Sequence, residues 1–323
     1  MLPPIHMTEK IFYIIVALIG VPVDLLGIVI LSRGKCGLST CTTCYLVAMA
    51  TADLLVIISQ VILNKISYYY FPVSYLDITP VCRIKAVMVT ASIECSVWFT
   101  VTFSFDRFVA ICCQKLKIKY CTKKTAILVI ATTSILLCLI NLPYYFTKEP
   151  AVIIRNVPWG CKQKPSTFTD HRWMGYNWLH KVLMPFLPFI LILLFNALTV
   201  RHILVASRVR KGLRGQNNGA NHSDPEMQSR RKSMILLFAI SGSFILLWFL
   251  YVVNFLYYTI RGLVYLTYSE FTLQQVGFLL ADLNCCTNTF IYGVTQYKFR
   301  EQVKKAVTYP FALMIKLMNK QNN

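Results

Sequence analysis

The sequence has few charged residues, and acidic residues are especially scarce. Only 14% of its 323 residues are Asp, Glu, Lys or Arg, whereas 56% are hydrophobic. This composition excludes a water-soluble globular domain of ordinary type, including a soluble enzyme. The 13 acidic residues are outnumbered by 33 basic ones, which gives a net charge of +20. Such an excess is typical of nucleic-acid binding, of contact with anionic lipid, or of the cytoplasmic loops of a membrane protein.

Patterns that carry catalysis or metal binding are also missing. We find no internal repeat, nucleotide-binding loop, catalytic triad or metal-ligand cluster, and the five histidines are scattered. The first ten residues lack the basic segment and cleavage site of a secretory signal peptide. We therefore expect a protein that is not an enzyme, and whose first apolar segment directs its insertion into a membrane.

Apolar segments long enough to cross a bilayer recur along the chain. About 20 consecutive apolar residues span the hydrocarbon core, and none of these segments alternates as barrel strands do. We predict an all-α membrane protein, a bundle of seven transmembrane helices, in which loops carry the positive charge and nucleic acid is not a partner. The predicted spans are Ile11–Leu31, Cys41–Leu63, Ala86–Ile111, Thr125–Phe146, Trp178–Val205, Ser233–Thr259 and Thr272–Val294.

The basic residues also predict the orientation of the bundle. Lys and Arg are retained on the cytoplasmic side, and most of them follow spans one, three, five and seven. The N-terminus is therefore expected outside and the C-terminus inside. The N-x-S/T triplet Asn221-His222-Ser223 then lies in the cytosol, which predicts an unglycosylated protein. The predicted parts are an extracellular N-terminus at 1–10, the seven-transmembrane domain at 11–294, a flexible third cytoplasmic loop at 206–232, and an amphipathic surface helix with a short tail at 295–323.

Two of the twelve cysteines stand apart from the others. Under this topology only Cys82 and Cys161 face the oxidising side of the membrane. A disulfide between them would hold the second outer loop over the mouth of the bundle. The other ten lie in spans or in the cytosol, where we expect small buried hydrophobic residues or free thiols.

The run Asp106-Arg107-Phe108 resembles the inner end of span three in rhodopsin-like (class A) G-protein-coupled receptors. Cys82 precedes it at the spacing of the family's outer disulfide cysteine. The Gly20–Asp24 and Leu142–Tyr145 segments are similar to the orphan branch that responds to aromatic amino acids and short peptides. Further matches are Leu46–Asp53 in span two, Pro188 in span five, Phe244 and Trp248 in span six, Asn288–Tyr292 in span seven with Thr289 in place of proline, and Phe299-Arg300 in the surface helix.

The resemblance implies a plasma-membrane receptor that transmits the binding of an extracellular small molecule or peptide to a heterotrimeric G protein. An aromatic amino acid or a short peptide is the favoured ligand, and membrane lipids surround the spans. An odorant-type chemosensory receptor is one alternative, indicated by the short N-terminus and the Asp106–Cys112 run. A non-signalling decoy or scavenger is another, indicated by Thr289, Leu250 and Asn196. A transporter is disfavoured because no inverted repeat is found.

The resemblance implies an activation switch that includes Arg107. It implies that Asp106 holds Arg107 at rest, and that Arg107 helps to form the cavity for the G-protein C-terminus once span six has moved outward. Arg230 stands near the place of the family's acidic partner in span six, which predicts raised basal activity. Leu250 replaces the proline that kinks span six. The alternatives are a snorkelling charge at Arg107 and ordinary core packing in span six. The implied set is Asp106, Arg107, Phe108, Phe244, Trp248, Asn288 and Tyr292.

Asp53 lies in mid-span, where an unpaired carboxylate is costly and usually marks a site. Ser96, Asn284 and Asn288 occupy the positions that join this aspartate around a sodium ion in the family, and oxygen ligands suit such a cation. A structural polar cluster is the alternative, and no other cofactor is expected. Asp24 replaces the family's asparagine in span one. Because two nearby carboxylates resist joint ionisation, we predict that Asp24 and Asp53 share a proton or bind the cation more strongly.

The ligand pocket is expected between the outer halves of spans three, five, six and seven. Val89 stands where amine receptors carry aspartate, and Asp282 stands where opsins carry the retinal lysine, so neither ligand class is expected. Ionisable groups of both signs predict a site for a zwitterion or a peptide end. A structural pair between Glu94 and His180 is the alternative. The predicted pocket residues are Val89, Thr90, Ile93, Glu94, His180, Lys181, Tyr251, Asn254, Gln274 and Asp282.

Overall fold

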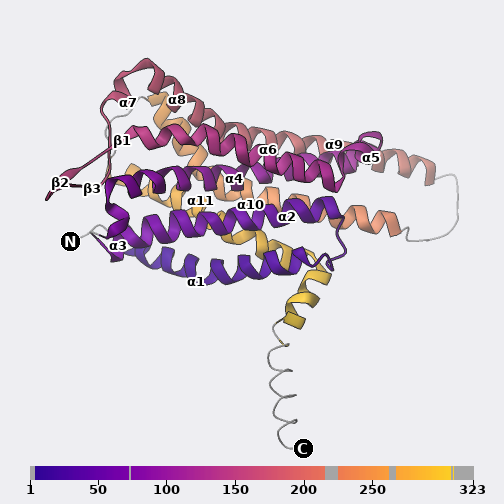
Figure 1. Cartoon of the computed structure of the whole chain (residues 1–323). Coiled ribbons are helices and arrows are strands. Elements are labelled where there is room, and N and C mark those ends of the chain that lie inside the picture. Colours follow the sequence, from indigo (N-terminus) through magenta and orange to yellow (C-terminus); the bar gives the residue numbers. More distant parts are fainter. Residues whose placement is uncertain (1–3, 73, 215–224, 262–266, 307, 309–323) are drawn as a thin grey trace, which may run out of the picture.

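The computed structural model describes residues 4–72, 74–214, 225–261, 267–306 and 308, with the side chains of residues 4, 209–214 and 225–230 left aside. The triplet at 221–223 and most of the predicted tail lie outside the described residues. Long helices run side by side and form one bundle (Figure 1). The fold is therefore the predicted all-α bundle. Its helices are α1 (Pro4–Ser32), α2 (Thr40–Val56), α3 (Ser67–Tyr70), α4 (Thr79–Cys112), α5 (Gln114–Tyr120), α6 (Lys123–Asn141), α7 (Ser166–Thr169), α8 (His171–Lys181), α9 (Leu187–Arg214), α10 (Pro225–Arg261) and α11 (Tyr268–Thr295).

Within the described residues, six helical stretches are long and apolar enough to cross a membrane. The seventh helix, α11, has sufficient length but is more polar, since it carries Glu270, Asp282 and Asn284. Together they make the seven-span bundle. The six stretches are Ile5–Ser32, Thr40–Tyr70, Thr79–Cys112, Lys123–Thr147, His171–Arg208 and Arg231–Arg261.

Short polar side chains begin several of these helices. The first backbone N–H groups of a helix have no partner within it, and a serine or threonine just before the helix can accept from them. Ser39 accepts from the backbone N–H of Thr42 at the start of α2, at 3.2 Å. Thr122 accepts in the same way from Thr125 at the start of α6, also at 3.2 Å. The polar residues between the apolar segments therefore fix where the spans begin.

Two spans contain helix irregularities that the apolar pattern does not predict. Span two continues from α2 through a π-helical segment, η1 (Ile57–Ile66), before α3. Span five passes from α8 to α9 through a second such segment, η4 (Val182–Phe186), which contains Pro185. Proline lacks an N–H group and interrupts regular helix hydrogen bonding, which accounts for the second irregularity.

Helical structure extends further along the chain than the predicted spans. Helix α1 already includes Pro4, ahead of the predicted start at Ile11. Helix α9 continues to Arg214 and α10 starts at Pro225, so both enter the predicted loop at 206–232. A helix satisfies its backbone hydrogen bonds internally and needs no membrane to continue.

The second outer loop contains short antiparallel strands. Strand β1 (Lys148–Glu149) pairs with β4 (Lys162–Gln163), and β2 (Val152–Ile154) pairs with β3 (Val157–Trp159). Arg155 and Asn156 connect β2 to β3, and both have positive φ angles. A two-residue turn of this kind matches the right-handed twist of the strands that it joins. The hairpin projects from the same end of the bundle as the N-terminus (Figure 1).

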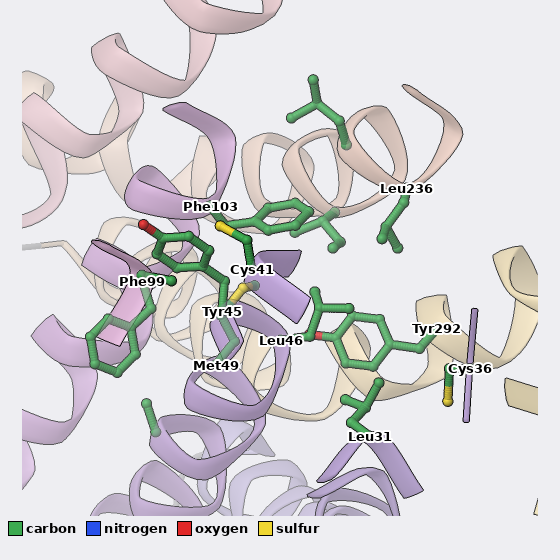
Figure 2. Close-up of a cluster of buried hydrophobic side chains, with 14 of the residues drawn as sticks. Leu31, Cys36, Cys41, Tyr45, Leu46, Met49, Phe99, Phe103, Leu236 and Tyr292 are labelled. Carbon is green, nitrogen blue, oxygen red and sulfur yellow. The ribbon is translucent and has the colours of Figure 1, made fainter. Parts of the chain in front are cut away.

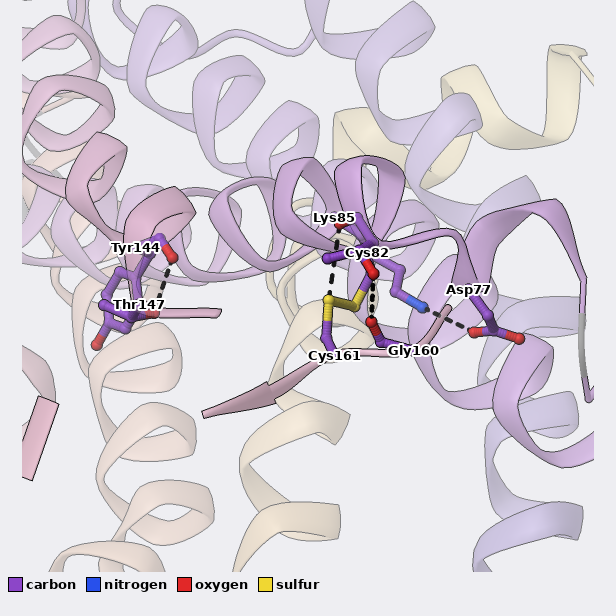
Figure 3. The surroundings of a disulfide bond; sticks show 8 residues. Asp77, Cys82, Lys85, Tyr144, Thr147, Gly160 and Cys161 are labelled. Atoms are coloured by element: carbon purple, nitrogen blue, oxygen red, sulfur yellow. Dashed lines mark hydrogen bonds and ion pairs between the residues drawn. A yellow bond between two sulfur atoms is a disulfide. The ribbon is translucent and has the colours of Figure 1, made fainter. Parts of the chain in front are cut away.

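The predicted disulfide between Cys82 and Cys161 is present, and it joins this loop to the start of α4 (Figure 3). The two Cα atoms lie 6.3 Å apart. Thr79 Oγ1 donates to the Gly160 carbonyl at 2.8 Å, and the Gly160 N–H donates to the carbonyl of Asp77 at 2.7 Å. Gly160 has a positive φ of 68°, which glycine adopts without strain. The loop is thus attached to α4 by covalent and backbone contacts.

A cluster of buried apolar side chains fills the opposite half of the bundle (Figure 2). Tyr45, Phe103 and Tyr292 are fully buried there and come from α2, α4 and α11. Leu236 of α10 belongs to the same cluster. Close packing of this kind makes the surrounding helices rigid, so it fixes the positions of nearby polar side chains.

Residues 297–306 form a further helix that leaves the bundle at an angle (Figure 1). Phe299 is buried, and its ring lies 6.2 Å from the ring of Tyr292. Arg300 Nη1 donates to the carbonyl of Val294 at 2.6 Å, at the end of α11. A cation is favoured beside the free carbonyls at a helix C-terminus. The short helix after span seven is therefore present as predicted.

Candidate functional site

The two ends of the bundle carry different polar sites. We call the end with the Cys82–Cys161 disulfide the outer end and the end with Arg107 the inner end, following the predicted orientation. Figure 1 shows the N-terminus and the β2–β3 hairpin at the outer end, and α5 at the inner end.

At the inner end, Arg107 is held from two sides. Its Nε donates to Asp106 Oδ2 at 3.0 Å, and Nη2 forms an ion pair with the same carboxylate. Its Nη1 donates to Ser233 Oγ at 3.1 Å. The first contact lies within α4, whereas the second joins α4 to α10. Arg230 belongs to the side chains left aside, so the prediction based on it stays a prediction.

The Asp106 carboxylate has a further partner that the sequence did not reveal. Cys41 Sγ of α2 donates to Asp106 Oδ1 at 3.1 Å, and both residues are buried. Because Arg107 occupies Oδ2, both carboxylate oxygens are engaged. The spacing of Cys41 and Ser233 in the sequence carries no signal for these contacts, which depend on how three helices pack.

A large cavity opens beside Arg107 at the inner end. Its volume is about 740 Å³, and its walls come from α4, α5, α10, the loop before α2 and the segment after α11. Among the described lining residues there are several basic side chains and no acidic one. The cavity is therefore electropositive and complementary to a negatively charged group. Its basic residues are Arg107, Lys117, Lys232, Lys298 and Arg300.

The aromatic residues of the predicted switch lie in the middle of the bundle. Phe244 and Trp248 stack with ring centroids 5.5 Å apart, and both are buried. Trp248 also contacts Tyr251 edge to face at 5.4 Å. Phe108 stacks on Phe195 of α9 at 6.0 Å. Phe244 and Trp248 thus form one stack, whereas Phe108 belongs to a separate contact between α4 and α9.

The polar residues predicted in mid-bundle are brought together in two groups. Asp53 accepts from Ser96 Oγ and from Asn288 Nδ2, the latter at 2.8 Å. Asp24 accepts from Thr289 Oγ1 at 2.8 Å. Both aspartates are fully buried, and their charges interact. Asn288 and Thr289 are neighbours on α11, so one helix turn links the two carboxylates.

Three buried oxygens in this region have no hydrogen-bond partner among the described atoms. They are Asp24 Oδ2, Asn284 Oδ1 and Tyr292 Oη. Asn284 lies one helical turn before Asn288 and shares its face of α11. A buried polar atom without a partner carries a substantial free-energy cost. These oxygens give the region the capacity to accept a cation or a proton.

Glu94 forms a buried network at the outer end. His180 Nδ1 lies 2.8 Å from Glu94 Oε1, and Asn141 Nδ2 donates to Glu94 Oε2 at 2.6 Å. The His180 ring packs between Tyr144 and Tyr176, with centroids at 4.8 and 4.5 Å. The structural pair that the sequence left open for Glu94 is thus present, and it joins spans three, four and five.

Asp282 lies on the other side of the bundle, against spans one and two. Tyr13 Oη donates to Asp282 Oδ2 at 2.9 Å, and Gln60 Nε2 donates to the same oxygen at 3.3 Å. Lys65 lies near this group, with Nζ 5.3 Å from the centre of the Tyr13 ring. Helix packing therefore gives Asp282 partners that the sequence did not identify.

A smaller cavity of about 260 Å³ lies between the outer ends of spans five, six and seven. Four of the ten predicted pocket residues line it, namely Lys181, Tyr251, Asn254 and Gln274. Glu94, His180, Asp282 and the span-three residues Val89, Thr90 and Ile93 do not belong to its described lining. Among the described lining residues, Lys181 carries the charge. The remaining lining residues are Phe255, Tyr258, Thr259 and Phe278.

Comparisons with known proteins agree with this architecture. The model of the 7 transmembrane receptor (rhodopsin family) matches residues 25–292, which is most of the chain. The tachykinin-like peptides receptor 86C of Drosophila melanogaster is 25% identical over 297 residues. That match covers 87% of this chain and 55% of the relative, so the chain spans only about half the length of that receptor. Atypical chemokine receptor 3 of Canis lupus familiaris is 22% identical over 280 residues, covering 84% of this chain and 71% of the relative.

Sequence, fold and comparisons therefore agree on a receptor. The seven-span bundle, the outer disulfide and the family match confirm the resemblance and a multi-pass location in the plasma membrane. The chain belongs to the rhodopsin family of seven-transmembrane receptors.

Proposed function

We propose that the protein is a G-protein-coupled receptor that transmits binding of an extracellular ligand to a heterotrimeric G protein. The observation that carries this proposal is Arg107, which borders the inner cavity while Asp106 and Ser233 hold it. A ligand that binds the active arrangement more tightly shifts the population toward it. In that arrangement the Arg107–Ser233 contact between α4 and α10 is broken and the inner cavity widens.

The charge of the inner cavity supports a protein partner that enters with its C-terminus. A polypeptide end carries a carboxylate, and the described lining of this cavity offers Lys117, Lys232 and Lys298 without an acidic lining residue, whereas Arg107 is paired with Asp106. Electrostatic complementarity of this kind increases both the association rate and the specificity of binding. The G-protein α-subunit is the partner of this type that we assign.

The outer cavity supports an aromatic ligand with a carboxylate, such as an aromatic amino acid or the end of a short peptide. Lys181 offers a cation, and Asn254 and Gln274 offer amide groups. Tyr251 and Phe278 form an aromatic pair on its wall, with centroids 5.3 Å apart. Small-molecule sites combine such an apolar lining with a few polar groups that set the orientation.

The polar core fits an allosteric sodium ion. Asp53, Ser96 and Asn288 would hold the ion, and the partnerless oxygens of Asn284 and Asp24 would complete its oxygen ligands. When bound, the ion would supply positive charge between two carboxylates. In the absence of the ion, a proton on one carboxylate would relieve their repulsion.

The test is G-protein activation in cells that carry a panel of Gα subunits. Wild type is compared with Arg107→Ala at matched surface expression, without ligand and with aromatic amino acids and short peptides. A signal that Arg107→Ala abolishes supports the proposal and identifies the coupled Gα class. A signal that persists in Arg107→Ala contradicts the role of Arg107, and silence of wild type with every subunit and ligand favours a decoy.

A non-signalling decoy is a second candidate, favoured by two features of spans six and seven. Helix α10 runs from Pro225 to Arg261 with Leu250 in place of the family's proline. Thr289, in place of another proline, ties α11 to Asp24 of α1. Both features stiffen helices that must move during activation. Uptake of labelled ligand without activation of any Gα subunit would support this second candidate.

A further inference from the structure

Two cysteines from separate segments meet at Asp106. Cys41 lies in the first turn of α2, and its Sγ donates to Asp106 Oδ1 at 3.1 Å. Cys121 lies between α5 and α6, and its Sγ donates to the Asp106 backbone carbonyl at 3.9 Å. A single residue of α4 thus holds two sulfur atoms from different parts of the chain, one at its carboxylate and one at its backbone carbonyl.

The two thiols differ in their access to solutes. Cys41 is 2% exposed and packs within the inner apolar cluster (Figure 2). Cys121 is half-buried and belongs to the lining of the inner cavity. A solute that enters this cavity from the cytosol therefore reaches Cys121 first, because Cys41 is buried and does not belong to the described lining of the cavity.

We propose that Cys41 and Cys121 form a reversible disulfide when a hydroperoxide reaches the inner cavity, making this pair an oxidative modification site on the cytosolic face. Disulfides in the cytosol are usually transient and often sense redox state. A reactive cysteine followed by a resolving one is the usual arrangement for such sensing.

The two steps conserve atoms and electrons. The Cys121 thiolate attacks one oxygen of the hydroperoxide, the O–O bond breaks, and the leaving oxygen takes a proton to give an alcohol or water. Cys121 is then a sulfenic acid. The Cys41 sulfur attacks the Cys121 sulfur, the S–O bond breaks, and the departing hydroxide takes the Cys41 proton and leaves as water. The two sulfurs together lose two electrons, which reduce the peroxide.

The surroundings of Cys121 favour its role as the first nucleophile. When Cys121 loses its proton, the single S–H proton of Cys41 can turn from Asp106 to the Cys121 thiolate, and this lowers the pKa of the Cys121 thiol. The thiolate is the reactive form of cysteine. Cys285 and Cys286, whose sulfurs lie 3.9 Å apart, offer no such access because both are buried in span seven.

The disulfide would change the contacts that hold Arg107. Cys41 would lose the S–H group that donates to Asp106, and Cys121 would become fixed to α2. Helix α5, which ends next to Cys121, supplies Gln114, Lys117 and Ile118 to the inner cavity. Since the bond fixes this wall in the position seen here, we expect oxidation to lower G-protein activation. This signalling consequence rests on the proposed function, whereas formation of the bond does not.

The test for the bond uses membranes from cells that express the full chain. They are treated with hydrogen peroxide, the free thiols are blocked with a maleimide, and the digested receptor is mapped by mass spectrometry. We expect a peptide pair that links Cys41 to Cys121 and separates on reduction with dithiothreitol. The matched control is Cys44→Ser, on the same helix as Cys41, which keeps the linked pair. The variant Cys121→Ser loses it.

The proposal is overturned if both cysteines of oxidised wild type carry the maleimide, or if Cys121 links to a different cysteine. Surface expression and thermal stability of each variant are measured first. Should Cys121→Ser fail to fold, the mapping of wild type and Cys44→Ser still decides the question.

The signalling arm measures G-protein activation in the same membranes. Peroxide should lower activation in wild type and Cys44→Ser, and dithiothreitol should restore it. An unchanged signal despite the linked peptide contradicts the regulatory consequence. If untreated wild type activates no Gα subunit, the proposed function fails, while the peptide map still decides the modification site.

Discussion

Arg107 Nη1 donates to Ser233 Oγ at 3.1 Å, and this hydrogen bond joins α4 to α10 at the inner end. Because serine is neutral, the link between the two helices lacks the second charge of an ion pair. A hydrogen bond to a charged group contributes about 1.5–3 kcal/mol. This hydrogen bond therefore contributes a modest energy to the contact between α4 and α10.

Replacement of Ser233 with alanine should raise basal activity. The variant removes the acceptor for Arg107 and leaves its contact with Asp106 in place, so the population shifts toward the active arrangement. A loss of about 1.4 kcal/mol corresponds to a tenfold change in that equilibrium, so we expect basal G-protein activation to rise several-fold. Ser233→Glu, which restores an ion pair, should lower it. Ser243→Ala on the same helix is the control, and equal basal activity in Ser233→Ala and Ser243→Ala would contradict the prediction.

Asp24→Asn should weaken the effect of sodium on the agonist response. The substitution replaces one of the two interacting carboxylates with a neutral amide. Asp24 Oδ2, which has no hydrogen-bond partner among the described atoms, then no longer belongs to a charged group. A sodium titration of agonist potency compares this variant with wild type and with Thr289→Val, which removes only the donor to Asp24. A sodium dependence in Asp24→Asn that equals that of wild type would contradict the involvement of Asp24.

Glu94→Gln should lower stability and leave ligand potency almost unchanged. Glu94 is engaged by His180 and Asn141, and it does not belong to the described lining of the outer cavity. Weakening a buried charged network typically costs a few kcal/mol. We expect a lower melting temperature in detergent. Lys181→Gln is the comparison, since it should reduce the potency of carboxylate ligands about tenfold or more with little loss of stability. A potency loss in Glu94→Gln as large as that in Lys181→Gln would assign Glu94 to the ligand.

The start of α11 should loosen in acid. The backbone N–H of Thr267 donates to Glu270 at 2.8 Å, and this bond holds the pKa of Glu270 below its usual value. A lowered pKa in the folded state means that the stabilisation is present above the usual pKa and is lost as pH falls below it. Hydrogen exchange of the first turn of α11 should therefore speed up below about pH 4.3 relative to other helix ends. In Glu270→Gln, hydrogen exchange of this first turn should not speed up in acid relative to other helix ends. If it still does, the Thr267–Glu270 bond is not the cause.

The sequence predicts the architecture because the bilayer imposes long apolar segments. The positions of the spans, the outer disulfide and the helix after span seven all follow from hydropathy, charge and motif. The helix ends are less predictable, as α4 shows by beginning at Thr79 instead of Ala86, because backbone hydrogen bonding continues where hydropathy stops.

The contacts of the site depend on helix rotation and register, which a one-dimensional pattern does not contain. The sequence places Asp53, Ser96 and Asn288 together through the family resemblance, and the structure brings them together. It does not place Cys41 at Asp106 or Asp282 beside Tyr13, because no motif links the members of these pairs. The polar side chains of a bundle must find partners inside it, and packing decides which ones they find.

The length of α10 has a mechanical consequence. Its 37 residues make a rod about 55 Å long at 1.5 Å per residue, whereas the hydrocarbon core is only about 30 Å thick. The helix therefore acts as a lever whose inner arm reaches well into the cytosol. A tilt of about ten degrees about a pivot at Asn254, beside the outer cavity, carries the inner tip, about 44 Å away at this rise per residue, sideways by about 8 Å. Residues next to the pivot move little, so a small rearrangement beside the outer cavity is magnified into a displacement on the scale of a side chain at the inner end.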